Sequence, residues 1–194
     1  SYALARDGWD TVALEPDPSY VVGAGAIRSL ARQAGLDIKV EETWGEKLPF
    51  KEETFDIVYC RAVLHHANDL NALCNEVWRV LKKGGTFIAT REHVISRRED
   101  LALFLESHPL HHLYGGENAY LINEYITAIR DSGIELEDML NPFQSDINLF
   151  PETVMSFKVR IAKRIRLPWP QAIPDILLKL LGSLTNQPGR LYTF

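Results

Sequence analysis

The first 90 residues alternate short apolar runs with longer runs in which apolar residues recur at helical spacing. The short runs predict strands at residues 11–15, 37–41, 55–60 and 86–90. The longer runs predict helices at residues 2–7, 19–34 and 70–81. Strands separated by helices form right-handed βαβ units, so we predict an α/β fold with a mostly parallel sheet and helices on both faces.

The predicted helix at 70–81 is followed by two basic residues and two glycines. We expect Lys82 and Lys83 to complement the negative end of the helix dipole and Gly84-Gly85 to end the helix. In parallel sheets the ligand crevice lies beyond the carboxyl ends of the strands. The residues that follow each predicted strand are therefore the ones to examine for chemistry.

The second half of the chain has a less regular pattern. It predicts helices at 122–132, 151–166 and 175–184, and strands at 134–141 and 191–194. One side of the 151–166 helix is basic, and the following helix is apolar. Residues 158–184 could therefore make a weak contact with a membrane surface or an anionic acceptor, or could simply be a solvated helix face.

Composition and charge exclude several classes of protein. The 194 residues are 46% hydrophobic and 24% charged, as in globular domains, and no apolar run is long enough to span a membrane. The net charge of −5 gives no electrostatic case for nucleic-acid binding. Two cysteines, Cys60 and Cys74, suit neither a disulfide framework nor a metal cluster. We expect free thiols, no metal and a reducing, cytoplasmic location.

Two of the predicted strands end at residues that could carry chemistry. Glu15 ends the first strand, and a carboxylate there can accept hydrogen bonds from both hydroxyls of a ribose. His65 and His66 follow the third strand, where a histidine can act as a base or contact a substrate. Taken singly, Glu15 could be an ordinary solvated residue, and each histidine could be a capping residue or a residue at the edge of the core.

Four segments occur in a characteristic order: the acid-ended strand, E-K-L-P-F before F-D-I-V, then L-H-H, then E-x-x-R-V-L-K-x-G-G. In this order they resemble the class I S-adenosylmethionine-dependent methyltransferases, especially the branch with the ubiquinone and menaquinone biosynthesis enzymes. The resemblance covers residues 1–90 well and 120–141 loosely. It implies a Rossmann-like fold. It also implies methyl transfer by direct displacement from S-adenosylmethionine to a small-molecule acceptor, which could be linked to a lipid or a sugar.

The resemblance also implies which residues bind the cofactor. Glu15 would bind the ribose hydroxyls. Trp44 stands where the family often has an Asp that contacts the adenine amino group, so stacking on the adenine would replace that hydrogen bond. A backbone contact from Gly45 or Glu46 would then supply the polar recognition.

Further residues match the family's segments nearest the reaction. Cys60 and Arg61 match the segment beside the methionine part of the cofactor. His65 and His66 match the segment nearest the transferred methyl group, and His65 is the first choice for a base. His66 is the second choice, with packing against a neighbouring helix as its alternative role, and His93 is the third.

The residues that would contact the acceptor lie in a lid segment at 91–119 and just after it. His93, Glu117 and Tyr120 are the candidates, because the stretch around the last two is polar and aromatic. The alternative for that stretch is a helix entry capped by Asn118. We expect a cofactor-binding core at 1–141, a helical cap insertion at 142–188 and the last core strand at 189–194.

One departure from the family concerns its G-x-G-x-G loop and the strand before it, which this sequence lacks. Gly23-Ala24-Gly25 lies in the wrong place and would loosen a helix start. We therefore expect a fragment, incomplete at its N-terminus, that binds S-adenosylmethionine weakly and is inactive alone. The strands that end near Glu15 and Cys60 would pair directly or leave a gap.

Two other functions fit some of the same residues. A catalytically inactive, methyltransferase-like binding module fits Trp44 and the missing loop. An NAD-dependent oxidoreductase fits an acid at the end of a strand, although it does not account for the L-P-F and L-H-H segments. The methyl acceptor, the atom methylated and the oligomeric state stay open.

Overall fold

The computed structural model describes residues 1–194 except for the side chain of Tyr114. The chain divides into two compact units, residues 1–51 (unit 1) and 52–194 (unit 2). Unit 1 contains α1 (Tyr2–Arg6), β1 (Thr11–Leu14), α2 (Ala24–Ala34) and β2 (Ile38–Glu41). Unit 2 begins with β3 (Phe55–Arg61), η1 (Leu64–His66), α3 (Leu70–Val80), β4 (Leu81–Thr90), β5 (Glu92–Ile95), α4 (Asp100–Ser107) and α5 (Pro109–Tyr114). It continues with β6 (Tyr120–Leu121), α6 (Ile122–Asp131), α7 (Asp146–Leu149), α8 (Val154–Ile165), η2 (Pro170–Ala172), α9 (Asp175–Leu184) and β7 (Arg190–Tyr192).

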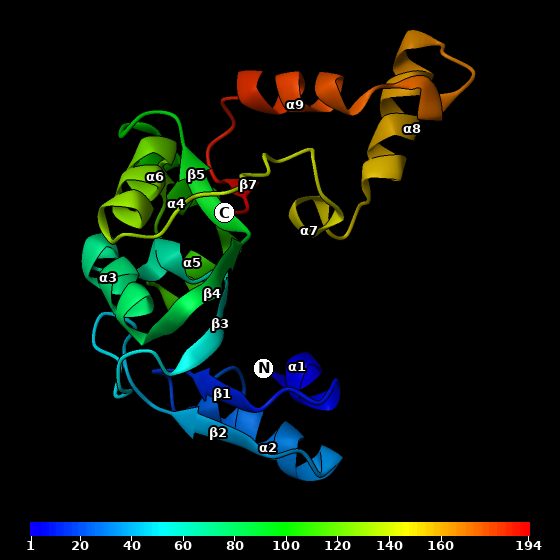
Figure 1. The fold of residues 1–194 in the computed structure, drawn as a ribbon. Coiled ribbons are helices and arrows are strands. Elements are labelled where there is room, and N and C mark those ends of the chain that lie inside the picture. Colours follow the sequence, from blue (N-terminus) through cyan, green and yellow to red (C-terminus); the bar gives the residue numbers. More distant parts are fainter. The chain divides into compact units, whose positions relative to one another are not determined.

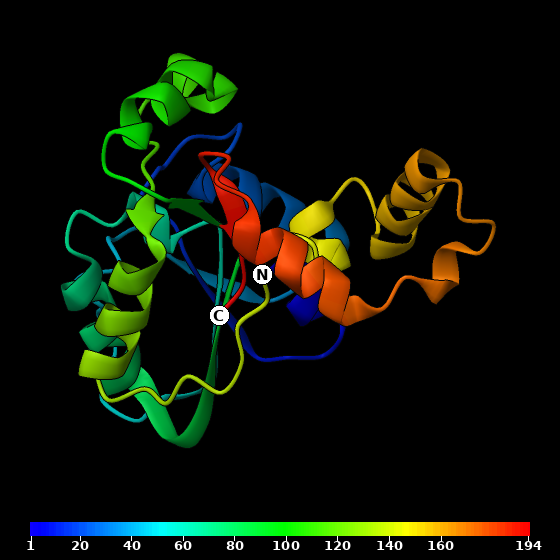
Figure 2. The same cartoon turned by 90° about the horizontal axis from the view of Figure 1, so that it is seen from above.

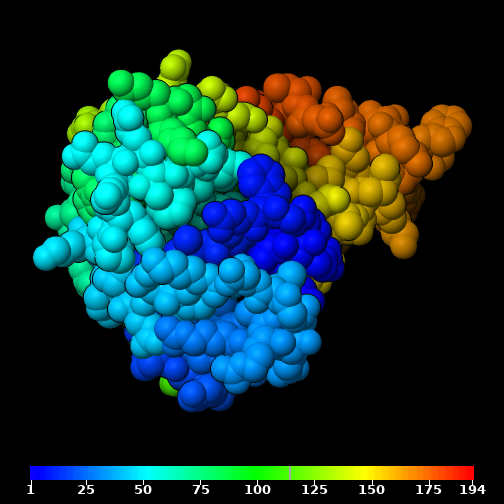
Figure 3. All heavy atoms as spheres, turned by 60° about the horizontal axis from the view of Figure 1, so that its bottom comes forward, coloured from blue at the N-terminus to red at the C-terminus, as the bar shows by residue number. Residues whose placement is uncertain are grey.

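Unit 1 is a βαβ unit in which β1 and β2 pair in parallel and α2 connects them (blue in Figures 1 and 3). Helix α2 begins at Ala24 rather than at residue 19 as predicted. The preceding residues form a turn instead, because the Ala24 amide donates to the Asp17 carbonyl at 2.7 Å. A Cβ atom on Gly23 would collide with that carbonyl, so the glycine fits the turn and does not loosen the helix.

The first sheet of unit 2 pairs β3 and β4 in parallel, with α3 as the crossover helix (Figure 1). Helix α3 ends at Val80, and the next residue, Leu81, is extended and pairs with Phe55. The two glycines therefore lie inside β4, and the prediction that they end the helix is wrong. Lys82 binds Asp56 of β3, with Nζ 2.8 Å from Oδ2, instead of complementing the helix dipole.

A second sheet of unit 2 has β5 at its centre, parallel to β6 and antiparallel to β7. The predicted terminal strand is present as β7, shifted by one residue at its start. The predicted strand at 134–141 is wrong except for one antiparallel bridge, Leu140 to Thr193, directly after β7. Among the described strands, β1 is hydrogen-bonded to β2, and β3 is hydrogen-bonded to β4.

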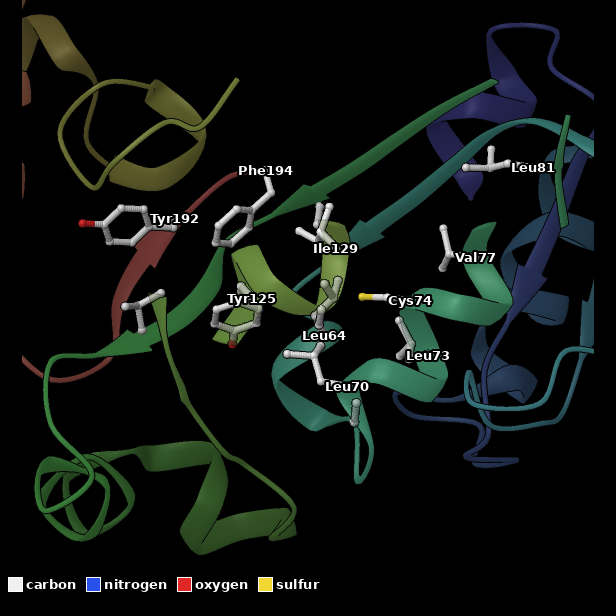
Figure 4. Packing of buried hydrophobic residues seen from close by; sticks show 14 residues of the cluster. Leu64, Leu70, Leu73, Cys74, Val77, Leu81, Tyr125, Ile129, Tyr192 and Phe194 are labelled. Atoms are coloured by element: carbon white, nitrogen blue, oxygen red, sulfur yellow. The ribbon is translucent and has the colours of Figure 1, made fainter. Parts of the chain in front are cut away.

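The core of unit 2 lies between α3, α6 and the β3–β4 pair. Figure 4 shows Cys74 and Val77 of α3 facing Tyr125 and Ile129 of α6, all of them buried. Phe194 packs on the Tyr125 ring with their centroids 5.2 Å apart. The predicted α/β class with parallel strand pairs is confirmed. The core also holds in place the carboxyl ends of β3 and β4, where the candidate site lies.

Residues 142–188 are largely helical, as predicted, and contain α7, α8, η2 and α9 (yellow to orange in Figures 1 and 2). Helix α8 begins three residues later than predicted, because Thr153 caps it by accepting a hydrogen bond from the Ser156 amide at 3.1 Å. The bounds of α9 agree with the prediction. None of the helices in the described part of the chain combines the length and apolar character that a membrane span requires.

Candidate functional site

A buried carboxylate organises the chain that follows β3. Glu92, at the start of β5, is completely buried and accepts three hydrogen bonds. The donors are the Val63 amide (3.0 Å), the His65 amide (3.1 Å) and His65 Nδ1 (2.7 Å). Glu92 therefore holds both the backbone of the η1 turn and the ring of His65 in place.

His65 lies between two carboxylates. Its side chain is 1% exposed, and its Nε2 atom is 3.5 Å from Glu117 Oε2. Burial acts to lower the pKa of His65, but Glu117 and Glu92 together outweigh it and raise that pKa above its ordinary value. The same contact with His65 lowers the pKa of Glu117 to about 2. The arrangement favours a charged imidazolium held by two carboxylates.

His66 has a different environment, because its side chain is exposed. Its Nδ1 atom is 2.8 Å from the carbonyl oxygen of Gly116. A carbonyl oxygen can only accept, so Nδ1 carries the proton and Nε2 has the lone pair in the neutral ring. His66 therefore has a nitrogen that can take up a proton.

His93 and His108 complete a group of histidines around Glu117. The His93 ring centroid is 4.7 Å from that of His65 and 5.1 Å from that of His108. Burial lowers the pKa of His93 to about 4, so this ring is neutral at pH 7. His108 Nδ1 is 3.9 Å from Glu117 Oε1. The structure thus brings together His65, His66, His93 and Glu117 from three places in the sequence.

Tyr120, Cys60 and Arg61 lie near this group along the chain but have other immediate partners. The Tyr120 hydroxyl donates to the carbonyl of Ala67 at 2.6 Å, which ties β6 to the residue after the η1 turn. The Cys60 carbonyl accepts a hydrogen bond from Thr90 Oγ1 at 3.4 Å, and Arg61 is exposed. Their roles in binding stay predictions.

The backbone is strained where both strands of the first sheet end. Ala62 follows β3 with a φ of 56°, and Arg91 follows β4 with a φ of 62°. Non-glycine residues adopt this left-handed region at a cost of about 1–3 kcal/mol, and such residues cluster at functional sites. The strained residues therefore lie at the carboxyl ends of β3 and β4, where the sequence predicts the functional residues.

The remaining candidates belong to unit 1, at the carboxyl ends of its two strands. The Glu15 amide donates to the Glu41 carbonyl at 3.0 Å, and Glu15 Oε1 accepts from the Asp17 amide at 3.0 Å. Trp44, in the loop after β2, is 61% exposed, whereas Gly45 and Glu46 beside it are half-buried. Unit 1 therefore presents a carboxylate and an indole after neighbouring parallel strands.

Two residues of the site were missed by the sequence reasoning. Glu92 is the second residue after the fourth predicted strand, and an acid so close to a strand end is a signal that could have identified it. His108 gave no signal, because it lies between α4 and α5 and reaches the site only through the fold.

Comparison with known proteins gives a family match over residues 1–89, to a family described as "Methyltransferase domain". "Uncharacterized methyltransferase YcgJ" of Bacillus subtilis is 32% identical over 92 residues, which are 43% of this chain and 36% of YcgJ. Sterol 24-C-methyltransferase ERG6B of Gibberella zeae is 39% identical over 128 residues, covering 60% of this chain and 31% of that protein. The chain thus spans about a third of the length of these two relatives.

Solved structures show the same fold at low sequence identity. The crystal structure of YcgJ superposes with a TM-score of 0.60 and 16% identity, covering 99% of this chain and 84% of that one. Geranyl diphosphate C-methyltransferase of Streptomyces coelicolor superposes with a TM-score of 0.65 and 14% identity, covering 99% and 65%. That structure contains S-adenosyl-L-homocysteine.

Proposed function

We propose that the chain is a class I S-adenosylmethionine-dependent methyltransferase, which transfers a methyl group from S-adenosylmethionine to a small-molecule acceptor. The observation that supports this best is the methyltransferase-domain match over residues 1–89, which includes the whole of unit 1. Its candidate binding residues lie at the carboxyl ends of parallel strands, where ligands bind in open α/β sheets.

The residues of unit 1 fit the nucleoside part of the cofactor. Glu15 offers carboxylate oxygens for the ribose hydroxyls. The exposed indole of Trp44 offers an apolar face on which an adenine can stack, while Gly45 and Glu46 offer backbone groups. When bound, S-adenosylmethionine supplies the methyl group on a positively charged sulfur, which leaves with the electron pair of the broken carbon–sulfur bond.

In unit 2 we assign different roles to the two adjacent histidines. His66 accepts the proton of a hydroxyl or amine acceptor on Nε2, because Nδ1 is already committed to the Gly116 carbonyl. His65 is a positioning residue, because both of its ring nitrogens face carboxylates and its side chain is buried. This proposal reverses the order in which the sequence ranks the two histidines as a base.

We further propose an apolar or lipid-linked acceptor. Helix α9 exposes Ile176, Leu180 and Leu184, which are 61%, 54% and 76% exposed and recur every four residues. The neighbouring helix in sequence, α8, has basic residues Lys163 and Arg164 in its last turn. Such a pair of helices suits the surface of an anionic membrane. ERG6B is named for a sterol and the Streptomyces coelicolor enzyme for geranyl diphosphate, an isoprenoid chain linked to a diphosphate, and both names support a lipid-like acceptor.

Binding of S-adenosylhomocysteine tests the function directly. We expect Glu15→Gln to weaken binding to the full chain about tenfold or more, since a hydrogen bond to a charged group contributes about 1.5–3 kcal/mol. Asp37→Asn is the matched control, because Asp37 is an exposed carboxylate just before β2, at the opposite end of the strands. The test is the ratio of the dissociation constants of the variant and the parent, measured by calorimetry, and it does not depend on the absolute affinity. Equal affinities for Glu15→Gln and the parent, or preferential binding of NADH, would overturn the proposal.

Methyl transfer separates an enzyme from an inactive binding module. With labelled S-adenosylmethionine and a panel of apolar alcohols and amines, the proposed function predicts transfer of label by the parent chain, a result that would overturn the expectation from the sequence that these residues are inactive alone. His66→Ala is expected to lower kcat while the dissociation constant of S-adenosylhomocysteine stays unchanged. Binding without transfer to any acceptor would favour the inactive binding module.

A further inference from the structure

Three side chains meet beside the group assigned to methyl transfer. They are His93 of β5, His108 between α4 and α5, and Glu117 before β6. Each offers one nitrogen or oxygen atom, and the three atoms lie within 4.8 Å of one another. We propose that His93, His108 and Glu117 bind one divalent transition-metal ion, for which Zn²⁺ is the best match to two imidazoles and one carboxylate.

The hydrogen bond of His93 prepares that ring as a ligand. Its Nδ1 atom is 2.9 Å from the carbonyl oxygen of Gly189, which can only accept. The proton therefore lies on Nδ1, and the lone pair of the neutral ring lies on Nε2. Metal-binding histidines commonly donate their other N–H to a backbone carbonyl or carboxylate in this way, which fixes the tautomer and the ring orientation.

Two atoms of the group lack hydrogen-bond partners although they are buried. Within the described residues, His108 Nδ1 and Glu117 Oε2 have no hydrogen bond, and the Glu117 side chain is only 8% exposed. Buried polar atoms without partners are uncommon, because each costs about 1–3 kcal/mol. A cation between these side chains would give both atoms a partner, since Glu117 Oε2 otherwise has only the 3.5 Å ion pair with His65 Nε2.

The spacing of the group suits closure around an ion. Ligand atoms about 2.0–2.1 Å from a tetrahedral zinc ion lie about 3.3 Å apart. His108 Nδ1 and Glu117 Oε1 are already 3.9 Å apart. His108 and Glu117 both lie outside helices and strands, where small shifts disturb no ladder of backbone hydrogen bonds. Three protein ligands leave one position for water or another small donor.

A second trio shares Glu117 but is the weaker candidate. His65, His66 and Glu117 also place ligand atoms within 4.8 Å of one another. His65 is already satisfied, because Nδ1 binds Glu92 and Nε2 forms an ion pair with Glu117. His66 is exposed, whereas His93 and His108 are partly enclosed. The spacing of residues along the chain indicates neither trio, because Glu117 lies far in sequence from the histidines at positions 65, 66 and 93.

Titration of the chelator-treated full chain with Zn²⁺, followed by calorimetry without any S-adenosylmethionine, tests the site. We expect one ion per chain, and we expect His108→Ala and Glu117→Gln each to weaken binding at least tenfold. His112→Ala is the matched control, because this exposed histidine of α5 has its Nε2 on the Glu106 carbonyl. It should change the affinity less than twofold. Co²⁺ in place of Zn²⁺ should give a visible absorption band that His108→Ala abolishes.

Several results would overturn the assignment. Absence of saturable Zn²⁺ binding would do so, as would equal affinities for the parent and His108→Ala. Loss of binding in His66→Ala with retention in His108→Ala would place the ion in the second trio instead. Because Glu117→Gln also removes the contact with His65, far-UV circular dichroism of each variant checks that it is folded. If Glu117→Gln does not fold, the Zn²⁺ affinity of His108→Ala alone tests the site. Binding of S-adenosylhomocysteine and its dependence on Glu15 are measured separately, so either proposal can fail alone.

Discussion

Substitution of Glu92 by glutamine should destabilise the protein strongly, although the two side chains have nearly the same shape. Glu92 is completely buried, and its two oxygens receive three N–H groups from Val63 and His65. Glutamine offers one acceptor oxygen and two donor hydrogens instead. Whichever way the amide is oriented, its NH₂ group faces at least one buried N–H group.

The size of the effect follows from these three hydrogen bonds. In the better orientation, the glutamine oxygen takes the place of Oε2 and keeps both bonds to His65. The Val63 amide then loses its acceptor, which costs about 1–3 kcal/mol, and the two remaining bonds lose their charge, which costs about 1 kcal/mol each. The sum is about 3–5 kcal/mol, in the range found when one partner of a buried ion pair is removed.

Urea unfolding, followed by far-UV circular dichroism, measures the global part of this effect. Hydrogen exchange at the Val63 and His65 amides measures the local part, and we expect exchange to accelerate about a hundredfold or more. Glu99→Gln is the control, because Glu99 is exposed and makes no capping bond to α4, so its change should stay within about 0.5 kcal/mol. A loss of less than 1 kcal/mol in Glu92→Gln, with unchanged exchange, would refute the role given to Glu92.

Three further predictions concern other parts of the chain. Burial raises the pKa of the Cys74 thiol to about 12, so at pH 8 it should have about a thousandfold less thiolate than a free cysteine and stay unreactive to a disulfide reagent until urea unfolds the protein. Asp69→Ala removes the side-chain cap of α3 and should lower the free energy of unfolding by about 1 kcal/mol, and an unchanged urea midpoint would contradict that cap. The double substitution Leu180→Glu and Leu184→Glu should reduce flotation with anionic vesicles, whereas Leu113→Glu, also at an exposed leucine, should not, and absence of flotation by the parent would exclude the membrane contact.

The helices and strands were predictable wherever the local pattern and the tertiary contacts agree. Helix α9 has the predicted bounds, because its apolar spacing is not opposed by any neighbouring strand. The end of α3 was mispredicted because Leu81 pairs with Phe55, and that long-range pairing outweighs the local preference for a glycine-terminated helix. Residues 134–141 alternate like a strand, but only Leu140 forms a bridge to another segment, and a sequence pattern does not reveal which residues find a pairing partner.

The candidate site was predictable only to the extent that it follows strand ends. Rules for parallel sheets led to Glu15, which ends a predicted strand, and to His65 and His66, which lie in the segment after another. Which of the two histidines is buried could not be inferred, since the η1 turn that separates them depends on Glu92. The positions of His93, His108 and Glu117 relative to one another depend on folding of the segment after β4.

Glu92 explains why these features occur together. A buried carboxylate is costly unless several donors satisfy it, and here two of the three donors are backbone amides of the η1 turn. The same carboxylate holds His65, whose other nitrogen faces Glu117, so the turn after β3 and the loop before β6 are coupled through one imidazole. His66 is then oriented by the loop carbonyl of Gly116 rather than by the sheet. A change at Glu92 should therefore disturb the orientation of His66 and weaken Zn²⁺ binding by the neighbouring trio, which the Zn²⁺ titration measures.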